Sequence, residues 1–139
     1  MQIEDIVDLD RFPLGSDDFG ARSRSSLDEN GVLVLENFIR PRALSAMQKE
    51  GRSAADQAFY CSQSHSVYLT PTDPDRDATH PANRQVVSSK GCICDDVVAP
   101  TSPLRILYND PMFRNFVKRA TDENGLHPYA DSLSSINIH

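Results

Sequence analysis

Tryptophan is absent from the sequence, and cysteine is scarce, with three residues in 139. An odd number of cysteines cannot all pair within one chain, which favours a reducing compartment over a disulfide-stabilised secreted domain. No apolar run approaches the roughly 20 residues of a membrane-spanning helix. The opening stretch MQIEDIVDLD is acidic and lacks the basic and apolar regions of a signal peptide. We therefore expect a soluble, cytoplasmic protein with no membrane partner.

Basic residues are outnumbered, with 14 Lys and Arg against 20 Asp and Glu, and the net charge is -6. Proteins that bind nucleic acids usually present a basic face, so we expect no nucleic-acid partner. The hydrophobic content of 39% and the charged content of 24% are typical of globular proteins. The length predicts a single domain, residues 1–139, that can bury a core. The oligomeric state is left open.

Helix signals occur in four segments, and we expect helices over residues 16–30, 40–60, 102–110 and 110–125. In the first, Ser16 can cap the opening turn and Gly31 suits a left-handed end. The two middle segments each carry a proline at a first-turn position. The fourth has the clearest pattern, because Asp110 caps it, Pro111 begins it, apolar residues follow at helical spacing, and Gly125 stops it.

Strand signals are fewer, and we expect strands over residues 32–38, 66–69 and 133–139. Val86 and Val87 are expected to contact the core. The rest of residues 61–100 is irregular, and a long irregular stretch is usually functional or partly disordered. Together these elements predict an α+β fold. They are too few to close a jelly roll of about eight strands.

The cysteines do not form a recognisable metal motif. GCIC, residues 91–94, is a C-x-C pair whose one distant partner is Cys61. A structural zinc site needs four ligands, usually in paired C-x2–4-C units or with close histidines, and His65 and His80 match no such spacing. Half-buried structural thiols are the simpler interpretation. A cysteine nucleophile beside a histidine stays open, because spatial neighbours cannot be read from sequence.

Two short stretches could contact an anion. SSKG, residues 88–91, offers hydroxyl groups, a cation and a glycine, although it lacks the frame of a phosphate-binding P-loop. HPANR, residues 80–84, places an imidazole and a guanidinium close together in a loop, where binding residues often lie. The simpler interpretation of SSKG is an ordinary turn, and the simpler interpretation of HPANR is a salt-bridged loop anchor.

The last residues alternate in polarity. In a strand, Ser135, Asn137 and His139 would share one face, while Ile136 and Ile138 would lie on the other. A polar face with Asn and His inside a barrel mouth would form a ligand wall. On an open sheet the same face would be exposed to solvent.

Three stretches of the sequence resemble the amino-terminal half of bacterial and fungal iron(II)/2-oxoglutarate-dependent oxygenases. The most specific is LHPYADSLSSINIH at residues 126–139, and RQVVSSKGCICDDVVAPTSPLRILYNDPMFRNFVKRAT at residues 84–121 precedes it. Upstream, LDENGVLVLENFI at residues 27–39 resembles the lead-in of the wider phytanoyl-CoA dioxygenase-like group. The branch with amino-acid hydroxylases and halogenases is the most similar. Ser132 is a departure, since the family usually has proline there.

The resemblance implies a helical amino-terminal cap followed by the entry strands of an incomplete double-stranded β-helix, or jelly roll. In the family, a glycine turn and a W-H-F-D-like segment follow the entry strand and supply the first iron ligands. His139 lies about ten residues too early to be the first ligand of the facial iron triad. We therefore expect neither iron nor 2-oxoglutarate on this chain alone, and no residue receives a catalytic or metal-binding role.

Other site residues are implied by the same resemblance. Asn137 and His139 would line the 2-oxoglutarate side of the cavity. The substrate side would be contacted by a loop with Arg84, Ser88, Ser89 and Lys90, and Tyr108 and Tyr129 are weaker candidates.

Two main functions remain. The first is the amino-terminal portion of an oxygenase that hydroxylates or halogenates a small amino-acid-like substrate, truncated before its iron ligands and inactive alone. The second is a non-catalytic α+β interaction module or a decayed remnant. A small thiol-dependent enzyme using Cys92 or Cys94 is a third hypothesis.

Overall fold

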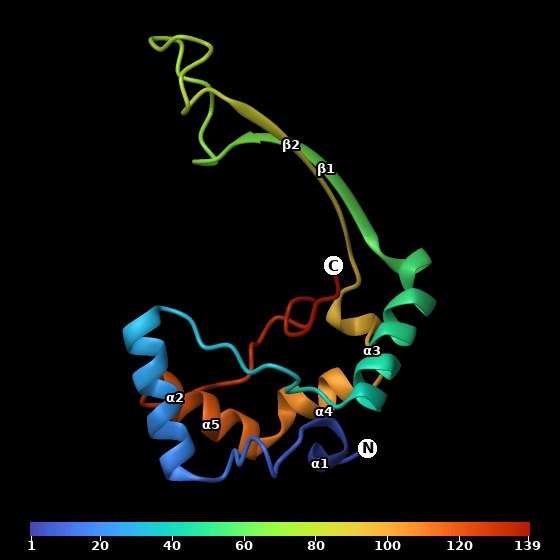
Figure 1. The fold of residues 1–139 in the computed structure, drawn as a ribbon. Coiled ribbons are helices and arrows are strands. Elements are labelled where there is room, and N and C mark those ends of the chain that lie inside the picture. The colour runs from blue at the N-terminus through green and yellow to red at the C-terminus, as the bar shows by residue number, and fades with distance from the viewer.

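A long β-hairpin projects from a base of helices in the computed structural model, which describes residues 1–139 (Figure 1). The α-helices are α1 (Ile3–Ile6), α2 (Asp17–Asn30), α3 (Pro41–Ser53), α4 (Pro103–Asn109) and α5 (Pro111–Thr121). Two 3₁₀ turns, η1 (Ala55–Gln57) and η2 (Asp95–Val97), flank the hairpin strands β1 (Phe59–Ser66) and β2 (Gln85–Cys92). Five α-helices and one two-stranded antiparallel sheet confirm the α+β class.

Local capping chemistry sets the start of α2 and α5, as the sequence predicts. Ser16 Oγ accepts a hydrogen bond from the Phe19 amide at 3.3 Å. Asp110 Oδ1 accepts one from the Phe113 amide at 2.9 Å. These bonds satisfy amide groups that have no partner inside the first helical turn. Gly31 ends α2 in the left-handed region with φ of 69°.

Two helix ends differ from expectation. α5 ends at Thr121 because Asp122, not Gly125, adopts the left-handed conformation, with φ of 56°. α3 ends at Ser53, although a helix through residue 60 is expected; Phe59 already belongs to β1. The apolar residues of this stretch have helical spacing, but pairing of β1 with β2 draws Phe59 and Tyr60 into a strand instead.

The strand predictions are mostly wrong. β1 and β2 pair in antiparallel register from Phe59 opposite Cys92 to Ser66 opposite Gln85, so Ser66 ends β1 and residues 67–69 lie in the turn beyond it. Val86 and Val87 are 44% and 72% exposed and contact no core. Residues 133–139 form no strand, only a single bridge between Ile138 and Ile93 with N–O distances of 2.8 and 3.1 Å.

Residues 32–35 are extended but pair with no strand, and residues 36–37 form a turn in which Asn37 has φ of 60°. Leu33 and Leu35 pack against the core, whereas Val32 and Val34 are 56% and 70% exposed. No backbone N–H group from residue 32 to residue 37 donates a hydrogen bond within the chain. The side chains therefore alternate as in a strand, while the backbone edge is left open.

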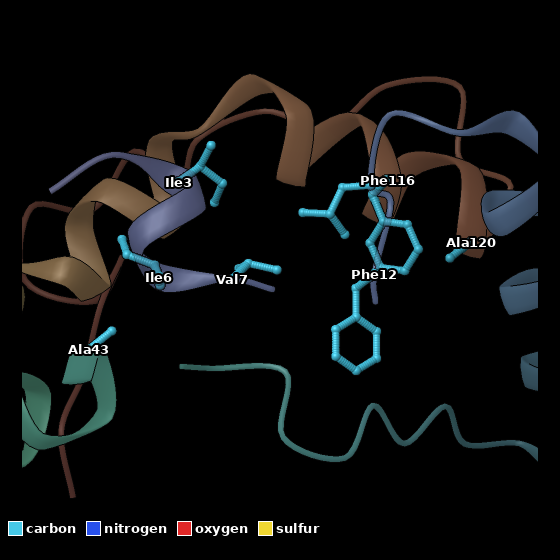
Figure 2. Packing of buried hydrophobic residues seen from close by; sticks show 8 residues of the cluster. Ile3, Ile6, Val7, Phe12, Ala43, Phe116 and Ala120 are labelled. Carbon is cyan, nitrogen blue, oxygen red and sulfur yellow. The ribbon is translucent and has the colours of Figure 1, made fainter. Parts of the chain in front are cut away.

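The core brings the two ends of the helical base together. Its buried cluster is formed by Ile3, Ile6, Val7, Phe12, Leu14, Ala43, Phe116 and Ala120 (Figure 2). α2 packs along α5, where the Phe19 and Phe116 rings stack with centroids 5.1 Å apart. The 2.7 Å bond from the Arg40 amide to the Ile6 carbonyl holds the start of α3 near α1.

Candidate functional site

The predicted substrate-side residues lie along the projecting hairpin rather than in a loop. Ser88, Ser89 and Lys90 belong to β2, and Arg84 precedes that strand with an exposed side chain. Successive strand residues point to opposite faces, so Ser88 and Lys90 share a face that Ser89 does not. At about 3.3 Å per residue, Arg84 and Lys90 are separated by roughly 20 Å. The hairpin does not bring these four side chains to one point.

The two predicted cofactor-side residues have different surroundings. Asn137 is exposed, and its amide nitrogen, oriented to donate, lies 3.0 Å from the carbonyl oxygens of Leu133 and Ile136. That side chain therefore closes a local turn. His139 is also exposed, but it lies at the foot of the hairpin beside a groove.

The groove at the hairpin foot has a volume of about 470 Å³ and lies between α3, β1, β2 and the final residues. Its lining is formed by Met47, Gln48, Gly51, Arg52, Ala55, Ala58, Tyr60, Gly91, Ile93, Ile138 and His139. Tyr60 covers Gly91 so closely that a Cβ there would lie 2.6 Å from the ring. Arg52 and His139 are the side chains of the lining that could attract an anion.

The three cysteines are half-buried thiols, and none is in a disulfide. Burial raises the pKa of the Cys94 thiol, and the neighbouring Cys92 thiol raises it further. A nucleophilic cysteine needs a lowered pKa, because the thiolate is the reactive species. The surroundings of Cys94 therefore favour a structural thiol over a catalytic one.

No group of three His, Cys, Asp or Glu side chains converges as a metal site would require. His65 Nδ1 lies 3.0 Å from the Ser66 carbonyl oxygen, and His80 Nδ1 accepts from the Ala82 amide at 3.1 Å. Both imidazoles are thus used in local turns. The residues present do not fit an iron site.

The loop that contains His80 is held by an asparagine that sequence reasoning does not single out. Buried Asn83 accepts from the Asp73 amide at 2.8 Å and donates to the carbonyl oxygens of Asp73, Arg76 and Asp77 at 2.9 to 3.2 Å. The ion pair in this loop joins Arg76 to Asp73 at 2.8 Å. The anchor expected from His80 and Arg84 is therefore replaced by Asn83.

Tyr108 and Tyr129 are brought together, since the Tyr129 amide donates to Tyr108 Oη at 2.8 Å. Tyr108 also lines a pocket of about 210 Å³ with Phe113, Arg114, Val117, Leu126, His127 and Pro128. Nothing in the sequence marks Arg114 or His127 as neighbours. Their proximity arises because residues 126–129 fold back along α4 and α5.

Comparisons with protein-family models, curated proteins and solved structures found no match to this chain. The oxygenase resemblance therefore stays a prediction from the sequence. Among the helices of the structure, none has both the length and the apolar character needed to cross a membrane.

Proposed function

We propose that this chain forms the amino-terminal helical portion of an iron(II)/2-oxoglutarate-dependent oxygenase that acts on a small amino-acid-like substrate. The parent reaction would couple oxidative decarboxylation of 2-oxoglutarate to hydroxylation or halogenation of a C–H bond. The iron ligands, in an H-x-D…H arrangement, would come from polypeptide outside this sequence. The choice of family rests on the resemblance of residues 27–39, 84–121 and 126–139.

The structural observation that carries the proposal is the amount of exposed surface. The accessible surface is 9622 Å². A folded monomer of 15.5 kDa is expected to expose about 7,200 Å², so roughly 2,400 Å² is in excess. One partner in a standard interface buries about 800 Å². The excess is about three times larger, as expected for a platform that a further layer of structure covers.

The open backbone of the extended residues 32–35 indicates what kind of layer would fit. An extended segment with one side packed on the core and unpaired N–H groups can add a strand along its edge. Soluble proteins rarely leave such edges without protection. A sheet added here would continue directly from the helical base, in keeping with the entry region of a jelly roll.

Iron binding and the neighbouring coding sequence test the proposal. Anaerobic calorimetric titration of iron(II), with 2-oxoglutarate present, is expected to give no stoichiometric micromolar binding to the 139-residue chain. The DNA after codon 139 is expected to encode a glycine turn and an H-x-D segment, in frame or after a frameshift. Expression of that joined reading frame should restore iron-dependent conversion of 2-oxoglutarate to succinate. Tight iron binding by the chain alone would contradict the proposal.

A second candidate, a non-catalytic interaction module, is favoured by the hairpin. β1 and β2 together carry one charged residue, Lys90. Seven of the exposed large apolar side chains gather on the hairpin and the turn beyond it: Phe59, Tyr60, Val67, Tyr68, Leu69, Val86 and Val87. Depletion of charge and enrichment in aromatic residues are typical of interface cores. Absence of an H-x-D segment downstream would favour this module over the oxygenase.

A further inference from the structure

We propose that the pocket of about 210 Å³ between α4, α5 and residues 126–128 binds the carboxylate of a small molecule with an apolar body. The pocket is separate from the groove that contains His139 and shares no lining residue with it. The inference does not depend on the oxygenase proposal, because it uses only side chains of this chain.

The first argument is the isolation of Arg114. Five arginines are half-buried, and four of them have polar partners: Arg24 with Asp28 and Asp122, Arg40 with Asp8, Arg105 with Asp95, and Arg119 with the Leu14 carbonyl. Arg114 is the fifth, and its guanidinium makes no hydrogen bond or ion pair. The Arg114 nitrogens are reached by solvent, since none of them is among the buried side-chain atoms that lack a partner. An external anion would supply the missing partner.

The second argument is the unused hydrogen of Tyr108. Its oxygen accepts the hydrogen bond from the Tyr129 amide at 2.8 Å, and no acceptor in the protein receives its own O–H. Arg114 and Tyr108 both line this pocket, so each brings an unused donor group to its wall. His127 lines that space as well, and an imidazole N–H can donate a further bond.

The third argument is that no carboxylate lines the pocket, although the chain carries a net charge of -6. A guanidinium can bind a carboxylate through two parallel N–H···O bonds, and a phenol can donate to a remaining lone pair. A set of donors without an acidic neighbour is complementary to an anionic oxygen pair.

The remaining walls define the rest of the ligand. Phe113, Val117, Leu126 and Pro128 are apolar, so they favour a hydrocarbon group beside the carboxylate. Since one water occupies about 30 Å³ in the liquid, the volume matches about seven water-sized groups. A branched monocarboxylate such as 3-methylbutanoate, with about seven non-hydrogen atoms, has this size and chemistry.

The test compares an acid with its uncharged analogue on the full chain. Sodium 3-methylbutanoate and 3-methylbutanamide are titrated while backbone amide shifts are recorded by NMR. We expect the acid to bind at millimolar concentration and about tenfold more tightly than the amide, a difference of about 1.4 kcal/mol. The shifted amides should lie within residues 104–129. Equal binding of both compounds, binding of neither, or shifts centred on the His139 groove would overturn the proposal.

Variants separate the two donors from general effects on folding. Arg114→Gln should weaken the acid about tenfold and leave the amide unchanged, while Arg114→Lys should retain part of the affinity. Tyr108→Phe should weaken the acid severalfold. Arg22→Gln is the matched control, since Arg22 is exposed on α2 and paired only with Asp18. Thermal unfolding of each variant checks its fold, and wild-type affinity in folded Arg114→Gln would refute the site.

Discussion

Ser102 Oγ donates a 2.5 Å hydrogen bond to Glu50 Oε2, which joins the start of α4 to α3 across 52 residues of sequence. The other carboxylate oxygen, Oε1, accepts from the Ala99 amide at 3.2 Å. One side chain thus fixes both sides of the turn that leads from the hairpin back into the helical base.

Removal of the Glu50 carboxylate should destabilise the fold. Ser102 is buried, and hydrogen bonds to charged groups contribute about 1.5–3 kcal/mol. We expect Glu50→Ala to lower the free energy of unfolding by about 2 kcal/mol and Glu50→Gln to lower it by less, as measured by urea denaturation. Lys49→Ala, on an exposed position of the same helix, is the control. Equal stability of Glu50→Ala and Lys49→Ala would contradict the role of this bond.

Gly20 allows the close approach of α2 to α5. A Cβ at Gly20 would lie 2.9 Å from Arg119 Nε, and Arg119 is held in place by its bond to the Leu14 carbonyl. Overpacking costs about 1–3 kcal/mol, which exceeds the gain of up to about 1 kcal/mol from replacing a helical glycine. We expect Gly20→Ala to lower the unfolding free energy by about 1 kcal/mol.

Gly51→Ala provides the contrast for that prediction. Its Cβ would lie 3.3 Å from Ile138, which belongs to a segment held by a single bridge and can shift. We expect no loss of stability in this variant by thermal unfolding. Equal stability of Gly20→Ala and Gly51→Ala towards unfolding would contradict the close contact between α2 and α5.

Asn83 should control the order of the hairpin loop and not the stability of the helical base. Asn83→Asp replaces the amide donor that faces three carbonyl oxygens with an acceptor. We expect faster tryptic cleavage after Arg76 in this variant, with an unchanged unfolding transition, because the core cluster contains no residue of this loop. Asn115→Asp on the exposed side of α5 is the control, and its cleavage pattern should match that of the wild type.

Asp131 should titrate below its ordinary range. The Leu133 amide lowers the pKa of this carboxyl from 3.8, and the Ser134 hydroxyl lowers it further, with bonds of 2.9 Å each. Since the pKa is lower in the folded state, the stabilisation is complete above pH 3.8 and is lost as the pH falls through the folded pKa. The Leu133 amide shift should report a midpoint below 3.8. A midpoint at or above that value would contradict these contacts. So would an unchanged pH dependence of the Leu133 amide shift in Asp131→Asn.

Local chemistry explains which elements can be predicted from the sequence. Ser16 and Asp110 mark helix starts because their side chains bond amides three residues ahead. β1 is different: FYCSQSHS has no apolar alternation, and it pairs with β2 across an intervening loop of 18 residues, 67–84. The opposite error occurs at residues 32–38. Their β-rich composition predicts a strand, but the fold places no partner strand beside them.

The candidate sites show the same limit. His139 is recognisable from its place in an alternating pattern, and it does line a groove. Arg114 is not recognisable, because its significance depends on what the folded chain fails to place beside it. Lack of a partner is a property of tertiary structure, and helical spacing carries no information about it.

The buried cluster has a consequence for synthesis of the chain. Leu14 and Phe19 find their partners on α5 about 100 residues later in the sequence: the Leu14 carbonyl accepts from Arg119, and the Phe19 ring stacks on Phe116. At roughly 5–20 residues per second, the first side chains wait about 5–20 s on the ribosome before the core can close. During that interval α2 lacks the surface of α5 on which it packs. Chaperones that bind nascent chains would encounter α2 without its partner, and the helical base would close only once α5 has been translated.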